Sequence, residues 1–265
     1  MTDLGDAIAK LPLPAAIIKP SGTNTKGKAN QRSAHALKAR VHLYMKQYPE
    51  AISEAQLASV GYSLVANVLD VWVVKNTTEA IWELQFNTTD TNGTNFFLLP
   101  ASAGGRNECR PSAGLAAAYS ANDARRILAT STDSRLRYYR AATDDDNVVL
   151  LRLPEMILIQ AEAMVERNTG TDLTDAVVLI DQIRNRAGIG AYAGTVDQVS
   201  LRDEVFLQRR LELALEGHYF FDLVRTGRAA TVLTNPVWNN NNALLPIPLR
   251  EIQSSGGVYT QNPGY

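Results

Sequence analysis

The sequence predicts a mainly α-helical fold of tetratricopeptide-like helical hairpins, an α/α superhelix, with long irregular loops and a few short strands. Two parts of the chain place apolar residues at helical spacing, and a stripe of small residues marks one predicted helix. The stretch between these parts is rich in Thr, Asn, Gly and β-branched residues, which is typical of loops and short strands. Because 45% of the 265 residues are hydrophobic, the chain can bury a sizeable core, and we expect a single domain over residues 1–265.

A helical hairpin is predicted over residues 27–60, after a loop at 11–29 that is rich in proline and polar turn residues. In the first helix, at about 30–46, apolar residues recur at i, i+4 and i+7. Pro49 can begin the second helix, at 49–59, because a first turn does not need the N–H that proline lacks. Small residues on the second helix permit a close approach of the two helices; they are Ala51, Ala55 and Ala58.

Residues 62–147 are predicted to be loop-rich, with short strands at 71–74 and 81–86. A polar turn cluster, NTTDTNGTN at 87–95, is followed by the run FFLL at 96–99. This order predicts an exposed loop on which aromatic rings lie beside amide side chains.

Residues 148–265 are predicted to return to helical structure, with three helices before residue 226. Gly188 ends the second of them, since glycine is common just after a helix. The later run LLPIP at 244–248 cannot be helical, because its prolines lack an N–H. The apolar positions of the three helices are Leu153, Ile157, Ala161 and Met164; Ala176, Ile180, Ile183 and Ala187; and Leu207, Leu211, Ala214 and Leu215.

Charge and composition exclude several classes of function. The 26 basic and 27 acidic residues give a net charge of -1, so no overall positive field would hold nucleic acid or an anionic membrane surface. One cysteine, Cys109, and three histidines give little basis for a metal site, and we expect neither a metal nor a cofactor. The sequence shows no export signal at its start and no window of about 20 apolar residues that could form a membrane helix.

Four motifs in the second half of the chain occur in a familiar order. They are LRLPEMILIQAEAMVERNTG at 150–169, IDQIRNRAGI at 180–189, LQRRLELALEGHYFFDLVRTGRA at 207–229, and LLPIPLREI with QNPGY at 244–265. On these motifs the chain resembles the SusD/RagB family. Segments upstream, at 3–12, 27–55 and 79–86, also look like this family, so the resemblance covers nearly the whole chain.

The resemblance implies a surface-exposed lipoprotein of the Bacteroidota outer membrane that binds glycans or related nutrients without catalysis. It also implies a partner, a TonB-dependent SusC-type transporter that receives the ligand, and membrane attachment only through a lipid anchor that this chain does not contain. Family members usually begin with an export signal, a lipidated cysteine and a helical section. We therefore expect the chain to be incomplete at its N-terminus relative to the family, as a fragment or through a downstream start codon.

Five charged residues near the third predicted helix allow two interpretations. Paired carboxylates suggest a glycoside hydrolase, which needs two carboxyl groups at a defined separation across a cleft. Each acid, however, has an arginine within helical reach, which favours a structural charge network that joins helix to loop. The residues are Arg209, Glu212, Glu216, Asp222 and Arg225.

A sugar-binding site normally combines an aromatic ring, which covers the apolar face of a pyranose, with amide or charged groups that bind hydroxyls. We expect such a site mainly in the loop-rich region, with Tyr138–Tyr139 and the segment after Trp238 as further candidate places. The candidate ligand-binding residues are Phe86, Asn92, Asn95, Phe96, Phe97, Arg106, Asn107 and Trp238. A helical-repeat adaptor that binds peptides stays open as an alternative function.

Overall fold

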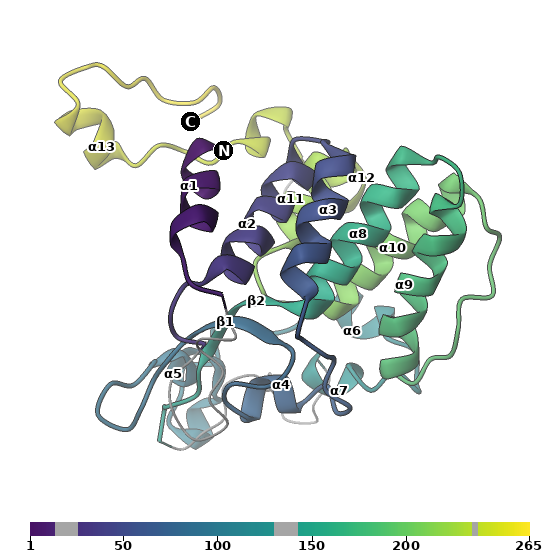
Figure 1. The fold of residues 1–265 in the computed structure, drawn as a ribbon. Coiled ribbons are helices and arrows are strands. Elements are labelled where there is room, and N and C mark those ends of the chain that lie inside the picture. The colour runs from purple at the N-terminus through teal and green to yellow at the C-terminus, as the bar shows by residue number, and fades with distance from the viewer. Residues whose placement is uncertain (14–25, 130–142, 235–237) are drawn as a thin grey trace. The chain divides into compact units, whose positions relative to one another are not determined.

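The computed structural model describes residues 1–13, 26–129, 143–234 and 238–265, without the side chains of Asn95 and Ala103 (Figure 1). The chain divides into two compact units, Met1–Glu212 and Leu213–Tyr265, which we describe separately. As predicted, the described structure is mainly helical, with one small two-stranded sheet. The single-domain organisation expected from the sequence stays a prediction.

The elements of the first unit are, in chain order, α1 (Thr2–Lys10), α2 (Gln31–Tyr44), α3 (Tyr48–Ser59), α4 (Asp70–Val73), β1 (Ala80–Leu84), α5 (Thr94–Leu98), η2 (Ala101–Ala103), α6 (Ala113–Ala118), α7 (Arg126–Ala129), β2 (Val148–Arg152), α8 (Leu153–Arg167), α9 (Asp172–Arg186) and α10 (Gln198–Glu212). Those of the second unit are α11 (Tyr219–Arg225), α12 (Ala229–Val232), η3 (Asn240–Ala243) and α13 (Leu249–Ser254).

The predicted N-terminal hairpin is confirmed as α2 and α3. Helix α2 begins where Asn30 and Ser33 cap each other: the Ser33 N–H donates to Asn30 Oδ1 at 3.1 Å, and the Asn30 N–H donates to Ser33 Oγ at 2.9 Å. Pro49 lies in the first turn of α3, as its missing N–H allows. The small residues that were predicted to let the helices approach are fully buried; they are Ala51, Ala55 and Ala58.

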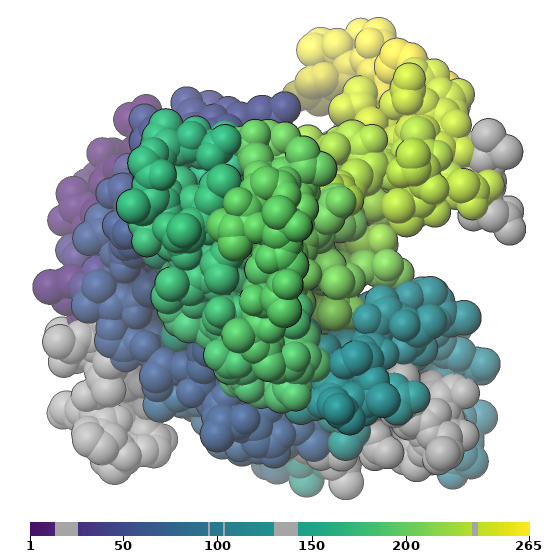
Figure 2. All heavy atoms as spheres, turned by 90° about the vertical axis from the view of Figure 1, so that its right-hand side faces the viewer, coloured from purple at the N-terminus to yellow at the C-terminus, as the bar shows by residue number. Residues whose placement is uncertain are grey.

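Helix α8 is the central element of the first unit, because its sides contribute to two hydrophobic cores. Met156 and Ile159 pack with α2 and α3, whereas Ala161 and Val165 pack with α9 and α10. Figure 2 shows α9 and α10 (green) side by side on the face turned toward the viewer. Leu98 of α5 belongs to another core, with Trp72 of α4, Leu128 of α7 and Val149 of β2.

Two short segments differ from the sequence prediction. The prediction of a strand at 71–74 was wrong, because these residues lie largely in helix α4. Just before this helix, Asn67 Oδ1 accepts the Leu69 N–H at 3.1 Å, which favours a turn. Residues 148–152, predicted to be helical, form strand β2, because their β-branched run finds an antiparallel partner in β1. The strand predicted at 81–86 is confirmed as β1.

Helix α10 ends earlier than its apolar pattern predicts. Its last residue is Glu212, and Leu215, predicted to share a face with Leu207 and Leu211, has a φ of 65° and is 46% exposed. The prediction that the apolar face continues to Leu215 was therefore wrong. Polar side chains occupy buried positions of α10 instead, including Arg209.

The carboxylate of Asp172, at the start of α9, accepts hydrogen bonds from residues at and after the end of α8. Arg167 donates two hydrogen bonds to Asp172, at 2.6 and 2.9 Å, and the Thr169 N–H donates a third at 2.9 Å. The hydrogen bonds from Arg167 hold the pKa of Asp172 well below its ordinary value of 3.8, against the effect of burial.

We expect Asp172→Asn to lower the free energy of unfolding at pH 7 by roughly 1–3 kcal/mol, because charge-assisted hydrogen bonds are lost. A carboxyl group whose pKa is depressed by folding stabilises the fold above its unfolded pKa, and this contribution is lost as pH falls toward the folded pKa. The difference in Tm between wild type and variant should therefore shrink as pH is lowered from 4 toward 2. Asp175→Asn, on the same helix, is the control and should change Tm much less; a pH-independent difference for Asp172→Asn would contradict the role of its charge.

The two closing sequence motifs pair with each other in the second unit. The side chain of Gln261 accepts the N–H of Ile247 at 2.8 Å and donates to the carbonyl of Ile247 at 2.9 Å. Asn262 Nδ2 donates to the carbonyl of Leu245 at 2.7 Å. The run LLPIP is not helical, so its backbone groups have no helical hydrogen-bond partners. The side-chain amides of QNPGY bond to three of these backbone groups instead.

Candidate functional site

Two phenylalanines and one arginine form an exposed surface that we call the aromatic platform: Phe96, Phe97 and Arg106. Phe96 is 47% exposed and Phe97 is 42% exposed. Their rings meet edge to face, with centroids 5.5 Å apart. The guanidinium of Arg106 lies 6.0 Å from the centre of the Phe97 ring and forms an ion pair with Glu108. The platform therefore places hydrogen-bond donors beside aromatic rings that are open to solvent.

The chain reverses after α5, and backbone hydrogen bonds fix the returning segment beside the helix. The Arg106 N–H donates to the carbonyl of Phe96 at 2.7 Å, and the Asn107 N–H donates to the carbonyl of Leu99 at 2.8 Å. Gly105 makes this approach possible, because a Cβ there would lie 2.2 Å from the carbonyl oxygen of Leu99. The shape of the platform is thus set by the backbone rather than by the rings themselves.

Asn92 has a structural use that the sequence did not reveal. Its Nδ2 donates to the carbonyl of Asp146 at 2.5 Å, and its Oδ1 accepts the Thr94 N–H at 2.6 Å. Both ends of the amide are therefore bonded within the protein, where they fix the start of α5. Its predicted contact with ligand stays a prediction.

Phe86 and Asn107, two further predicted ligand residues, are both half-buried. Phe86 is half-buried, and its N–H and carbonyl are bonded to Asn147 at 3.0 Å and Lys75 at 3.1 Å. Asn107 has a φ of 50°, a left-handed conformation that asparagine tolerates better than most residues, and its side chain is half-buried. Asn107 is next to Arg106 in the returning segment, so it belongs to the same loop as the platform.

For the other predicted ligand residues, the described structure gives no position relative to the platform. Trp238 belongs to the second unit, where its ring lies 6.4 Å from that of Phe220. The side chain of Asn95 and the pair at 138–139 lie outside the described residues.

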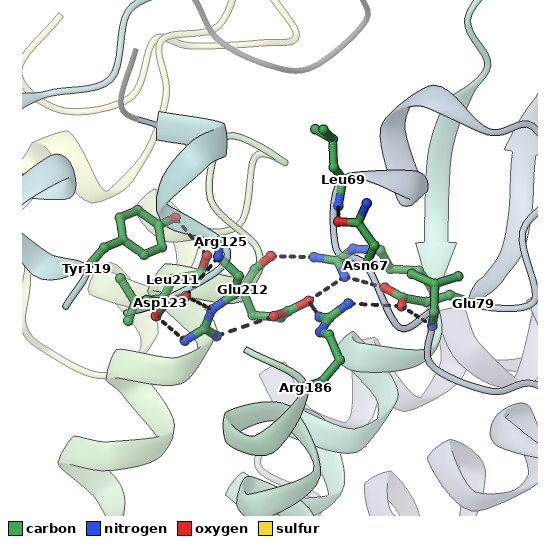
Figure 3. Close-up of polar contacts among 11 residues, drawn as sticks. Asn67, Leu69, Glu79, Tyr119, Asp123, Arg125, Arg186, Leu211 and Glu212 are labelled. Atoms are coloured by element: carbon green, nitrogen blue, oxygen red, sulfur yellow. Dashed lines mark hydrogen bonds and ion pairs between the residues drawn. The ribbon is translucent and has the colours of Figure 1, made fainter. Parts of the chain in front are cut away.

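A second group of polar side chains is buried in the first unit, at the end of α10. Figure 3 shows Glu212 surrounded by guanidinium groups. Arg152 Nη1 lies 2.7 Å from Glu212 Oε1, Arg125 Nη1 lies 3.3 Å from Oε2, and Arg186 also pairs with Oε1. The side chain of Glu212 is 0% exposed.

Two more carboxylates complete this group, which we call the buried ion-pair network. Glu79 accepts hydrogen bonds from Arg152 at 2.9 Å and from Arg186 at 3.2 Å. Asp123 accepts two from the side chain of Arg125, at 2.8 and 2.9 Å. The network therefore joins the turn before β1, the segment before α7, β2, and the ends of α9 and α10 (Figure 3).

The network separates the pKa values of its two glutamates. Burial alone would raise the pKa of Glu212, but the charges of Arg186, Arg152 and Arg125 outweigh it and lower the pKa to about 2. For Glu79, burial outweighs its arginine partners and raises the pKa, and the charge on Glu212 adds to the rise. Glu212 is thus a permanent anion at neutral pH and an unsuitable proton donor.

Sequence spacing predicted an arginine partner for Glu212 within helical reach. The three arginines that pair with Glu212 come from other parts of the chain, and the position of Arg152 and Arg186 inside sequence motifs was the available signal. Arg209 contributes to a different pair, with Glu162 on α8 at 3.5 Å.

The remaining predicted charges lie in the second unit. Asp222 and Arg225 pair at 2.7 Å, one turn apart on α11. Glu216 lies between α10 and α11, where its N–H donates to the carbonyl of Leu213 at 3.3 Å. The five charges predicted as one network are therefore distributed over both units.

Within the described residues, acidic, histidine and cysteine side chains nowhere gather into a group of three that could hold a metal ion. The helices of the same residues include none that is long and apolar enough to cross a membrane.

The fold of this chain is shared with proteins of known structure. Residues 133–265 match the SusD family. SusD-like protein P38 of Formosa agariphila is 37% identical over 98 residues, which are 34% of this chain and 19% of that protein. The chain belongs to the SusD family.

Solved structures show the same fold over the whole chain. A laminarin-binding SusD-like protein has a TM-score of 0.81 at 26% identity, covering 100% of this chain and 68% of that one. Surface glycan-binding protein A of Bacteroides thetaiotaomicron, in complex with laminarihexaose, has a TM-score of 0.78 at 20% identity, covering 98% and 69%. The chain thus spans about two thirds of these structures, and its matches cover 19–31% of the curated relatives.

Proposed function

We propose that this protein binds glycans reversibly at the bacterial cell surface, without chemistry, and delivers them to a TonB-dependent SusC-type outer-membrane transporter. The observation that carries the proposal is the aromatic platform: two solvent-open rings on α5, and an arginine on the returning segment that is hydrogen-bonded to it. Membership of the SusD family supports it, since relatives of this family bind laminarin and laminarihexaose.

The chemistry of the platform fits an uncharged sugar. The apolar face of a pyranose can cover an exposed phenyl ring, while its hydroxyls accept hydrogen bonds from a guanidinium. The charge of Arg106 is already balanced by Glu108. An anionic ligand would therefore gain little from this arginine, whereas a neutral ligand needs no such charge.

The absence of catalysis is part of the proposal, and the buried network supports it. A glycoside hydrolase needs a carboxyl group that can reach the substrate and give up a proton. Glu212, one of the carboxylates that could suggest this chemistry, is sealed from solvent and its pKa is about 2. Its role is to bind arginines.

Phe97→Ala is expected to weaken glycan binding about fivefold, because covering a half-exposed phenyl ring contributes about 1 kcal/mol. The measurement is calorimetric titration with laminarihexaose, maltohexaose and cellohexaose, with each mixture assayed for new reducing ends. Tyr259→Ala is the matched control, since Tyr259 is an aromatic residue that is 56% exposed and lies in the other unit.

Saturable binding of an intact sugar, weakened by Phe97→Ala and unchanged by Tyr259→Ala, supports the proposal. New reducing ends that disappear in Glu216→Gln would point to a hydrolase instead. Saturable binding of peptides without any response to sugars would point to a helical-repeat adaptor.

The transporter partner needs a separate experiment. Cross-linking in native membranes followed by mass spectrometry should recover a SusC-type barrel, and recovery of other proteins alone would count against this partner.

A further inference from the structure

The second unit contains an aromatic cluster of its own, formed by Phe220, Phe221 and Trp238. The rings of Phe220 and Phe221 meet edge to face with centroids 5.6 Å apart, and the Phe220 and Trp238 centroids are 6.4 Å apart. Phe221 is 47% exposed, and the other two are half-buried. The cluster repeats the ring geometry of Phe96 and Phe97, whose centroids are 5.5 Å apart.

An asparagine turn follows Trp238 directly. Asn239 caps helix η3: its Oδ1 accepts the Asn241 N–H at 3.0 Å, and its own N–H donates to Asn242 Oδ1 at 3.0 Å. These bonds fix the backbone of the turn, on which Asn240 is exposed.

The C-terminal segment supports this turn from another side. Gly264 lies against Asn241, where a Cβ would come within 2.9 Å of the asparagine Cβ. The hydroxyl of Tyr265 donates to the carbonyl of Leu244 at 2.9 Å, just after η3. The turn is therefore ordered before any ligand arrives, which lowers the entropy that binding must overcome.

We propose that Phe221, Trp238 and Asn240 form a second carbohydrate-binding platform, separate from the one at Phe96 and Phe97. An exposed phenyl ring, a half-buried indole and the exposed asparagine turn that follows it suit a pyranose, whose ring face is apolar and whose rim carries hydroxyls. A polysaccharide presents many equivalent sugar units, so the same class of ligand suits both platforms. This inference rests on the proposed glycan-binding function and adds a second site to it.

The test is affinity electrophoresis of the full chain in gels that contain laminarin or starch, with Phe97→Ala, Phe221→Ala and the double variant. Each single variant is expected to lose about fivefold in affinity, since each loses one exposed ring. The double variant should lose the retardation altogether. Asn240→Ala, a change at an exposed turn, should weaken binding without affecting thermal unfolding, and Tyr259→Ala should behave like wild type.

Tryptophan fluorescence provides an independent measurement. Trp72 is buried and Trp82 is part of the first unit, so a change on titration with laminarin that disappears in Trp238→Phe would report binding at the second platform. If Phe97→Ala abolishes retardation while Phe221→Ala and Trp238→Phe match wild type, the second platform is refuted and the proposed function stands. If the wild type is retarded by neither polysaccharide, both proposals fail.

Discussion

Replacing Glu212 with alanine is expected to lower the free energy of unfolding by about 3–5 kcal/mol, the cost of removing one partner from a buried ion pair. The side chain of Glu212 is 0% exposed and faces Arg125, Arg152 and Arg186. Without it, those buried guanidinium groups keep their charge, because arginine does not lose its proton in proteins. Glu79 and Asp123 would then be the carboxylates left to the three arginines, so the buried group would keep an excess positive charge.

Chemical denaturation of the wild type and Glu212→Ala measures this difference. Glu166→Ala is the matched control, since Glu166 also pairs with an arginine, Arg202, but both side chains are partly open to solvent, at 23% and 40% exposed. An exposed pair of this kind contributes about 0–1 kcal/mol. If the two variants lost similar free energies of unfolding, the buried network would contribute no more to stability than an exposed ion pair.

Gly105→Ala is expected to reduce glycan binding roughly thirtyfold, because it displaces both rings of the aromatic platform together. The new Cβ would lie 2.2 Å from the carbonyl oxygen of Leu99, a distance that forces the backbone apart. The hydrogen bond between the Arg106 N–H and the Phe96 carbonyl then breaks. Two half-exposed rings at about 1 kcal/mol each give this factor.

Calorimetric titration with the best-binding hexasaccharide measures the effect, and thermal unfolding measures stability alongside. Gly114→Ala is the control: it lies in helix α6, where the nearest atom to a new Cβ is 3.6 Å away, so alanine should be tolerated or slightly stabilising. Unchanged binding by Gly105→Ala would show that the shape of this loop does not determine ligand binding.

Helices were predictable from the sequence where their signals are local. The apolar spacing of α2, Pro49 and the alanine stripe of α3 all lie within the helices that they define. Strand β2 was missed because its identity depends on β1, a partner 60 and more residues earlier in the chain.

The features of the candidate site also divide into those predicted from local sequence and those that depend on distant partners. The exposed rings of Phe96 and Phe97 followed from a local run of turn residues and aromatics. The structural use of Asn92 did not, because its partner Asp146 is 54 residues away. The arginines around Glu212 were also distant, and sequence spacing along one helix carries no information about such partners.

The span of the buried network has a consequence for how the first unit folds. Glu212 bonds to residues that are 26, 60 and 87 positions away in the chain, through Arg186, Arg152 and Arg125. An intermediate that docks only some of these segments would bury charges without partners, so it gains little until the last segment arrives. The first unit should therefore assemble slowly and in one cooperative step, with α10 among the last elements to be locked in place.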